Sequence, residues 1–343
     1  MKTLQVKTEN RVSSIHVGEK LGNVSASLPG GKTIIITDEN VERIYGPLFP
    51  RCPVITIPTG EKIKTLATCE TIYRELIRLK ADRSTFILGI GGGIVCDITG
   101  FAASTYMRGL PFGFVATTLL SQVDASVGGK NGVNFDAFKN MVGVFSQPEF
   151  VLCDTAMLNT LPEKEIVNGL AEIVKHGLIA DEAMVSFLEA NAEKALALDH
   201  DVITRLVLDS VRIKGEIVEK DERETGDRRK LNFGHTIGHA LEKTATGKGI
   251  SHGMAVAVGM AGAADLSRKR GLITEQENQR ITRLLHRLHL PTTHDIPPDL
   301  VMDAVAKDKK KQDNTIHFVF LAAIGLARVE KADIEEIRQA VFT

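Results

Sequence analysis

The sequence contains no tryptophan, and aromatic residues make up only 5% of its 343 positions. The hydrophobic core must therefore consist mainly of aliphatic side chains. The four cysteines lie far apart and form no Cys-x-x-Cys pair, which argues against a disulfide framework and against a thiolate zinc site. We expect all four to be reduced, buried thiols: Cys52, Cys69, Cys96 and Cys153.

Two further absences narrow the class of protein. The first ten residues, MKTLQVKTEN, lack the apolar segment of a signal peptide, and the uncharged stretches fall short of the roughly 18 residues that indicate a membrane span. The formal net charge is −1, so no global basic excess indicates nucleic-acid binding. We expect a cytoplasmic protein without nucleic-acid or membrane partners, in which local clusters bind any anion.

The length favours two domains, because a single core rarely grows beyond about 250–300 residues. In the first half, apolar runs such as KTIIIT, STFILGIGGG and EFVLCD alternate with helical segments, which predicts a parallel sheet covered on both faces. The second half reads as helical, with one late strand in TIHFVFLAAIG. Helices are expected after Pro162 and at roughly 181–198, 200–220, 232–245, 252–270 and 275–289. We expect an α/β nucleotide-binding domain over 1–158 and a mainly α-helical, metal-binding domain over 159–343, packed around a cleft.

A glycine-rich loop, GIGGGIVCDITGF (residues 89–101), follows an apolar run and opens a helix. Its consecutive glycines let the backbone approach an anion, and the first amides of the helix would point at that anion. The loop departs from Gly-x-Gly-x-x-Gly at Ile94, and it follows a later strand instead of the first. We favour a pyrophosphate site of another topology over a strict Rossmann site or a plain tight turn.

Two more segments of the first half suggest anion or nucleotide contacts. Asp38 ends an apolar strand, where an acid can bind a ribose diol, but TDEN is also an ordinary helix N-cap sequence. The segment SVGGKNGVNFDAFKN (residues 126–140) places Lys130 and Lys139 among glycines and asparagines, which is typical of an anion-binding loop. A solvated basic loop is the alternative.

Histidines of the second half suggest a metal site. In LNFGHTIGHA, His235 and His239 are four residues apart and would share one helix face. His252 begins a small-residue helix, SHGMAVAVGMAG. A catalytic zinc ion takes three His, Asp or Glu ligands and keeps one position open. Glu172 is the candidate carboxylate, although it and Lys175 can equally form a surface ion pair. We expect the remaining candidates to be solvated: His200, His286, His289 and His294.

Together these stretches resemble the 3-dehydroquinate synthase family. The matching runs follow the family's order over nearly the whole chain: GEKIK, GGGIVCDITGF, ATTLLSQVDASVGGKNGVN, KNMVG, LAEIVKHG, DERE, LNFGHTIGHA, HG at 252–253 and DKK at 308–310. The resemblance implies a carbon–oxygen lyase of the shikimate pathway that uses NAD and one divalent metal ion, zinc or cobalt. It would convert 3-deoxy-D-arabino-heptulosonate 7-phosphate, a small sugar phosphate, to 3-dehydroquinate and phosphate. A homodimer is implied as well.

The resemblance also implies roles for individual residues. It makes Glu172, His235 and His252 the metal ligands, and His239 a group that touches substrate or supports a ligand. The implied cofactor residues are Asp38, Asn40, Thr59, Gly60, Glu61, Lys62, Ile63, Lys64, Gly92, Gly93, Ile94, Val95, Cys96, Asp97, Thr117, Thr118, Asp124, Lys130 and Lys139. The implied substrate residues are Lys130, Asn140, Lys175, Lys214, Arg228, Asn232 and Lys310, with Lys309 as the alternative to Lys310. Arg108 is implied to reach the phosphate site of a neighbouring subunit.

The chain departs from the family pattern at two positions of the anion loop. Phe135 and Phe138 stand where family members often carry His and Gly, so we expect a differently shaped loop. Other functions remain open: a related sugar-phosphate cyclase, a metal-dependent alcohol or glycerol dehydrogenase, or a non-catalytic nucleotide-binding protein. Arg228 favours a substrate with a carboxylate. A dehydrogenase would release NADH and would not need so many phosphate-directed lysines.

Overall fold

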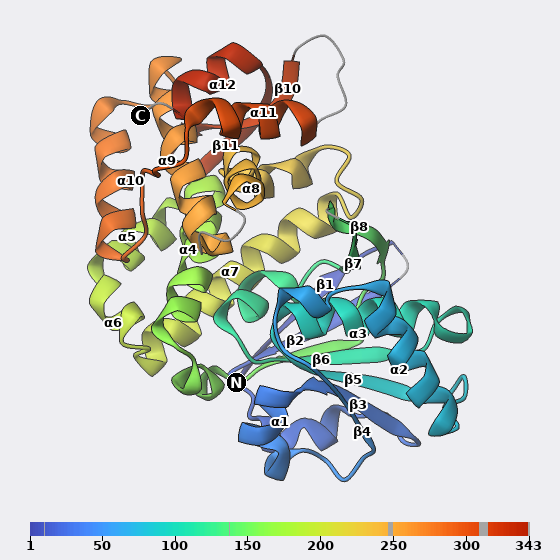
Figure 1. Cartoon of the computed structure of the whole chain (residues 1–343). Helices are drawn as coiled ribbons and strands as arrows, with labels where there is room; N and C mark the ends of the chain where they lie inside the picture. Colours follow the sequence, from blue (N-terminus) through green and yellow to red (C-terminus); the bar gives the residue numbers. More distant parts are fainter. Residues whose placement is uncertain (10, 137, 246–249, 309–314, 342–343) are drawn as a thin grey trace. The chain divides into compact units, whose positions relative to one another are not determined.

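The computed structural model describes the chain except for residues 10, 137, 246–249, 309–314 and 342–343 (Figure 1). The chain forms two compact units. The first comprises Met1–Leu161 and Lys214–Glu222, and the second comprises Pro162–Ile213 and Arg223–Thr343. A single boundary at residue 158, as inferred from sequence, leaves out the return of Lys214–Glu222 to the first unit.

The first unit is built on a seven-stranded sheet in the order β1-β2-β9-β6-β5-β3-β4. Neighbouring strands pair in parallel, except that β1 and β2 are antiparallel. The predicted parallel sheet is therefore confirmed apart from its edge strand β1. The strands are β1 (Lys2–Lys7), β2 (Val12–Val17), β3 (Thr33–Asp38), β4 (Val54–Ile57), β5 (Phe86–Gly91), β6 (Phe112–Ala116) and β9 (Phe150–Cys153).

Helices cover both faces of this sheet, as predicted. Helices α2 (Leu66–Arg78) and α3 (Gly93–Thr105) lie on one face, and α1 (Glu39–Tyr45) lies on the other (Figure 1). Every residue of β5 and β6 is buried, which explains why their sequences do not alternate. Short helical turns complete the unit: η1 (Leu21–Ser27), η2 (Gly46–Leu48), η3 (Glu61–Ile63), η4 (Tyr106–Arg108), η5 (Ser121–Ala125) and η6 (Thr155–Thr160).

The predicted anion loop at 126–140 is in large part a β-hairpin. Strands β7 (Lys130–Phe135) and β8 (Phe138–Phe145) pair antiparallel, with Lys130 opposite Phe145. Val133 is fully buried, whereas Phe135 and Phe138 are exposed. The glycines and asparagines that suggested a loop are accommodated because Gly132 and Gly143 face each other across the pair. The glycine- and asparagine-rich composition of this segment therefore did not indicate its two strands.

The second unit is mainly helical, as predicted, but several details of the prediction were wrong. The segment 181–198 forms two helices that meet at Asn191, and the late strand is the first half of a hairpin followed by an unpredicted helix. The elements are α4 (Glu163–Ala180), α5 (Glu182–Ala190), α6 (Ala192–Leu196), α7 (His200–Lys220, whose last turns belong to the first unit), η7 (Asp227–Asn232), α8 (His235–Thr244), α9 (His252–Lys269), α10 (Glu275–Arg287), α11 (Pro298–Asp308), β10 (Thr315–Ala323), β11 (Leu326–Asp333) and α12 (Ile334–Val341).

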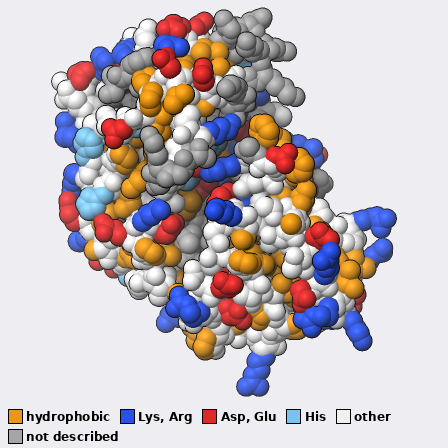
Figure 2. All heavy atoms as spheres, viewed as in Figure 1, with side chains coloured by type: hydrophobic (Ala, Val, Ile, Leu, Met, Phe, Trp, Pro, Cys, Tyr) orange, Lys and Arg blue, Asp and Glu red, His pale blue; other side chains and the backbone are white. Residues whose placement is uncertain are grey.

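Helix α4 is buried on every side over residues 166–179. The apolar pattern of the sequence does not account for this burial, because Glu172, Lys175 and His176 interrupt it. These three polar side chains are instead enclosed. Among the described helices, none is long and apolar enough to cross a membrane. On the face shown in Figure 2, basic and acidic side chains are interspersed, in keeping with the net charge of −1.

Candidate active site

The glycine loop lies at the carboxyl end of β5, where the strand order reverses direction. The chain forms β3 and β4 on one side, then returns past β3 to form β5 and β6. In open α/β sheets, ligands bind outside the strand ends at this switch point. A Cβ on Gly91 would lie 2.5 Å from Val95 Cβ, and one on Gly92 would lie 3.0 Å from Thr118 Cγ2. Only glycine therefore allows α3 to start this close to the strand.

The ends of β3 and β6 flank this loop. The Thr117 N–H donates to the Gly91 carbonyl (3.0 Å), which ties the end of β6 to the end of β5. The Asp38 carboxylate accepts from the backbone N–H groups of Asn40 and Val41, so it is the N-cap of α1. The N-cap reading of TDEN is thus observed, and ribose binding by Asp38 stays a prediction. Asn40 is exposed beside it.

A buried lysine links the glycine-loop helix to the hairpin. Lys64 is 5% exposed, and its Nζ donates to Asp97 Oδ2 (2.5 Å) and to Asn140 Oδ1 (2.5 Å). Burial raises the pKa of Asp97, and the Lys64 ammonium partly offsets that effect. Lys64, Asp97 and Asn140, predicted to bind cofactor or substrate, are therefore brought together in the first unit.

Asn134 completes this network, and sequence reasoning missed it. Its N–H donates to the Lys64 carbonyl (2.8 Å), its Nδ2 donates to Glu61 Oε1 (2.8 Å), and its Oδ1 accepts from the Asn140 N–H (2.9 Å). Asn134 thus fixes the GEKIK loop against the hairpin. Its place in GVNF, within a matching run, was the available signal.

A third contact in this unit joins two more predicted residues. Lys214 is 6% exposed, and its Nζ donates to the Asp124 carboxylate (2.6 Å) and carbonyl (2.7 Å). Asp124 lies in η5, a short π-helical turn, a form that is frequent at functional sites. The other predicted residues of this unit lie in or beside η3, the first turn of α3, the end of β6 and the β7–β8 hairpin: exposed Thr59, Gly60, Lys62, Lys130 and Lys139, half-buried Ile63, Gly93, Ile94 and Thr118, and buried Val95 and Cys96.

The second unit brings the three predicted metal ligands together. The Nε2 atoms of His235 and His252 lie 3.6 and 3.5 Å from the same oxygen, Oε1 of Glu172. Two atoms bound to one zinc ion at about 2.1 Å and a tetrahedral angle would be about 3.4 Å apart. The Glu172 side chain is fully buried; its Oε2 pairs with the Lys175 ammonium, and its Oε1 faces the two imidazoles. The three side chains therefore fit one divalent cation.

Close helix packing creates this cluster. A Cβ on Gly253 would lie 2.5 Å from the Asn168 carbonyl oxygen, and the Gly253 N–H donates to the Asn168 side chain. Asn168 precedes Glu172 by four residues, so both lie on the same face of α4. The start of α9 is thereby held beside Glu172. Sequence reasoning missed Asn168, although its i, i+4 spacing to Glu172 was visible.

The nitrogen atoms on the other side of both rings have acceptors. Nδ1 of His235 lies 3.2 Å from the Phe233 carbonyl, and Nδ1 of His252 lies 3.4 Å from Glu242 Oε2. A neutral ring with its proton on Nδ1 directs its Nε2 lone pair at the cluster, which is the usual arrangement for metal-binding histidines. Glu242 did not figure in the sequence analysis, although it follows His235 by two helical turns.

The charges of the cluster depend on one another. Burial raises the pKa of Glu172, but the Lys175 ammonium, with which it forms a buried ion pair, and the two histidines His235 and His252 together outweigh burial and hold the pKa well below its usual range. Burial, with Lys175, lowers the pKa of His235. Burial also lowers the pKa of His252, but Glu172 and Glu242 outweigh it and raise the pKa to about 10. The hypothesis of a surface ion pair for Glu172 is wrong.

The remaining predicted residues of the second unit lie in η7 and α8 or outside the described residues. His239 is exposed, with its ring edge-on to His235 at 5.1 Å between centroids, and it is not in the group of three possible ligands. Arg228, in η7, is 2% exposed, and Asn232 donates to Glu224. Lys309 and Lys310 lie outside the described residues. Of the histidines expected to be solvated, His294 is instead half-buried.

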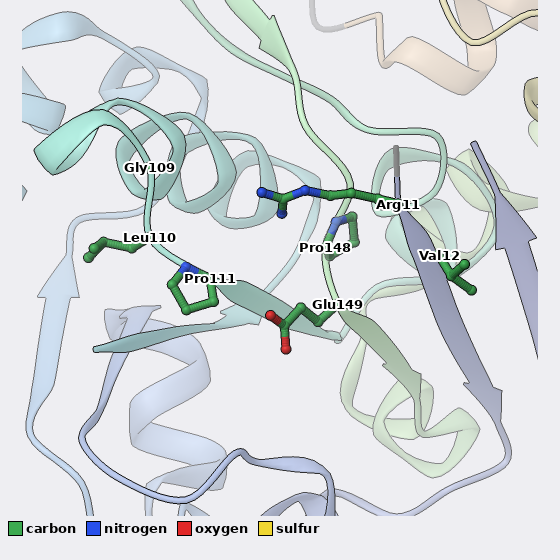
Figure 3. A pocket seen from close by; sticks show the side chains of 7 residues that line it. All are labelled: Arg11, Val12, Gly109, Leu110, Pro111, Pro148 and Glu149. Carbon is green, nitrogen blue, oxygen red and sulfur yellow. The ribbon is translucent and has the colours of Figure 1, made fainter. Parts of the chain in front are cut away.

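A surface pocket of the first unit lies away from these residues (Figure 3). It is lined by Arg11, Val12, Gly109, Leu110, Pro111, Pro148 and Glu149. These residues adjoin the amino ends of β2, β6 and β9, which is the sheet edge opposite the glycine loop. The side chains of Arg11 and Glu149 give it both signs of charge. It does not share residues with either candidate cluster.

These features define a class of protein: an α/β unit with a glycine loop at a helix start, and a helical unit with three side chains that could hold one metal ion. The family model for the 3-dehydroquinate synthase N-terminal region matches residues 54–168, and that for the C-terminal region matches residues 169–311. The chain is 42% identical to 3-dehydroquinate synthase of Methylococcus capsulatus over 345 residues, covering 97% of this chain and 96% of the relative. The chain belongs to the 3-dehydroquinate synthase family, which confirms the resemblance seen in its motifs.

Solved structures show the same fold with ligands bound. One is 2-epi-5-epi-valiolone synthase from Streptomyces hygroscopicus subsp. jinggangensis with NAD+ and Zn2+ (TM-score 0.89, 28% identity, 100% of this chain and 98% of that chain). Another is 2-deoxy-scyllo-inosose synthase with carbaglucose-6-phosphate, NAD+ and Co2+ (TM-score 0.84, 27% identity, 99% of each chain).

Proposed function

We propose that this chain converts 3-deoxy-D-arabino-heptulosonate 7-phosphate to 3-dehydroquinate and phosphate, using NAD and one divalent metal ion. In this reaction an alcohol is transiently oxidised, phosphate is eliminated, the alcohol is restored, and the ring opens and closes again by an aldol step. No net oxidation occurs, so the enzyme acts as a carbon–oxygen lyase. The observation that carries the proposal is the convergence of Glu172, His235 and His252, in a chain of this family.

The ligand set suits zinc or cobalt. Glu172, His235 and His252 would hold the ion through one oxygen and two imidazole nitrogens, which leaves a position for the substrate. When bound, NAD takes up and returns one hydride, and the metal ion polarises the alcohol that is oxidised. The glycine loop and the amides that begin α3 would bind the pyrophosphate of NAD, and the Lys64–Asp97–Asn140 network would position the loops around it.

Basic residues would bind the two anionic groups of the substrate. Arg228 offers a rigid, bidentate fork for the carboxylate. Lys130, Lys175 and Lys214 would hold phosphate and ring oxygens as point charges. His239, which lies in α8 and is open to solvent, and Asn232, three residues before α8, would pass protons. Lys310 keeps its proposed substrate role from the resemblance alone.

We further propose a homodimer in which Arg108 reaches the phosphate site of the neighbouring copy. Arg108 is exposed and has a left-handed backbone (φ 71°), as does Met107 before it (φ 49°). Such a conformation is costly for residues other than glycine and clusters at functional positions.

The direct test is a product assay. The purified chain is incubated with the heptulosonate phosphate, a catalytic amount of NAD and Zn2+ or Co2+. We expect one phosphate per 3-dehydroquinate and no accumulation of NADH. Steady NADH release without phosphate would instead indicate a dehydrogenase.

The related cyclase activities are the second candidate, because the two solved structures carry them. Arg228→Lys separates the possibilities. If Arg228 binds the substrate carboxylate, this variant loses turnover of the heptulosonate far more than NAD affinity, measured by calorimetry. Equal losses in both quantities would count against its assigned role.

A further inference from the structure

Helix α8 contributes more to the metal cluster than its ligand His235. Glu242 follows His235 by seven residues and His239 by three, so all three lie on one face of α8. The Glu242 side chain is only 8% exposed. Its Oε2 lies 3.4 Å from Nδ1 of His252, whose Nε2 in turn faces Glu172. The His252 ring is therefore held between two carboxylates, one on each nitrogen.

The two histidines are oriented by different means. His235 has the carbonyl of Phe233, two residues earlier in its own chain segment, as its Nδ1 partner. His252 is the first residue of α9, and its Nδ1 partner comes from another helix. Among the described residues, the Nδ1 partner of His252 is thus a side chain that is not itself in the ligand group.

Charge gives a second reason for an acid at this point. The amino end of α9 carries the positive end of a helix dipole, which disfavours a cation beside His252. Lys175 pairs with Glu172 and offsets much of the charge of that ligand. Because Lys175 offsets the negative charge of Glu172, Glu242 would supply the further negative charge that compensates a divalent ion at the start of α9.

We propose that Glu242 is a positioning residue of the metal site, which holds His252 in the Nδ1–H form and directs its Nε2 at the ion. A carboxylate that orients a metal-binding histidine typically contributes 10–100-fold to metal affinity. The inference rests on the proposed function only in taking Glu172, His235 and His252 as the ligands, and it requires no particular substrate.

Metal binding to the purified full-length chain tests the proposal without an activity assay. Co2+ affinity is measured by competition with a chelator in the wild type and in Glu242→Ala, Glu242→Gln, Glu163→Ala and His252→Ala. Glu163 is the matched control. Its Oε1 also lies close to a histidine Nδ1 atom, at 3.2 Å from that of His289, but both of these side chains are exposed. We expect a 10–100-fold loss in Glu242→Ala, a smaller loss in Glu242→Gln, and wild-type affinity in Glu163→Ala.

A structural readout separates orientation from general damage. In the zinc-loaded protein with 15N-labelled histidine, the Nδ1–H signal of His252 is identified by its loss in His252→Ala. It should persist in Glu242→Gln, whose amide oxygen can accept the same bond, and should disappear by exchange in Glu242→Ala.

The following results would overturn the proposed role of Glu242 or the ligand set. Wild-type Co2+ affinity in Glu242→Ala overturns the proposal, as does an unchanged Nδ1–H signal. If Glu242→Ala does not fold, Glu242→Gln decides: unchanged affinity then counts against a role for the charge. Wild-type affinity in His252→Ala overturns the ligand set itself, and Glu242 with it. A chain that binds metal as expected but makes no 3-dehydroquinate contradicts the proposed reaction and leaves Glu242 in place.

Discussion

The metal cluster of the second unit and the β7–β8 hairpin of the first carry predicted functional residues in opposite settings. Glu172 and Lys175 are almost completely buried, and the helices that bear the ligands approach each other through glycines. On the hairpin, by contrast, Lys139 and Asn140 are exposed. Both segments are rich in glycine and polar residues, so the difference lies in the packing around them.

This difference indicates how each site acquires its shape. Buried side chains of the metal cluster are fixed by the fold, so a ligand finds them already in place. The hairpin residues are held by a few hydrogen bonds at its edge, and their final positions depend more on what binds. Changes at the metal cluster should therefore affect stability and binding together, whereas changes at the hairpin should affect binding with little loss of stability.

The largest effect is expected from Glu172→Gln. This change leaves the Lys175 ammonium buried without its carboxylate, and breaking a buried pair in this way typically costs about 3–5 kcal/mol. Urea unfolding of the metal-free protein measures the loss, and Co2+ binding should be abolished in the same variant. Adding Lys175→Met removes the stranded charge and should restore part of the stability but no metal binding. Wild-type stability in Glu172→Gln would show that the cluster is not fixed by its ion pair.

A smaller effect is expected from Gly259→Ala in α9. A Cβ there would lie 1.9 Å from the Gly234 carbonyl oxygen, directly before His235, so α8 and α9 would have to separate. Overpacking typically costs about 1–3 kcal/mol, although alanine is the better helix former. We expect a lower midpoint of urea unfolding and weaker Co2+ binding. Gly22→Ala is the control, since no atom lies within 4 Å of its added Cβ. Equal stability of both variants would contradict close packing as the origin of the site.

The difference between local sequence patterns and packing also explains which features the sequence could predict. The glycine loop, the parallel sheet and the helical second half follow from local patterns, and the metal ligands were implied by motifs that lie far apart. Asn168 and Glu242 act through contacts between helices, which no local pattern reveals. The hairpin was mistaken for a loop because Gly132 and Gly143, separated in sequence, lie opposite each other only after the two strands have paired. What the sequence could not provide was tertiary context.

The smallest effect on stability is expected from Asn134→Ala in the hairpin. This change removes the side-chain bonds to Glu61 and to the Asn140 N–H, which lie near the surface, and should cost only about 1 kcal/mol of unfolding free energy. NAD affinity, measured by calorimetry, should nevertheless fall by about tenfold, because the GEKIK loop loses its anchor, while Co2+ affinity stays at the wild-type value. Asn23→Ala is the matched control, since Asn23 also donates to an exposed glutamate, Glu19 at 2.7 Å, away from the glycine loop. If Asn134→Ala destabilises the chain as much as Gly259→Ala, or leaves NAD affinity unchanged, the hairpin is as rigid as the metal cluster and the contrast between the two regions is wrong.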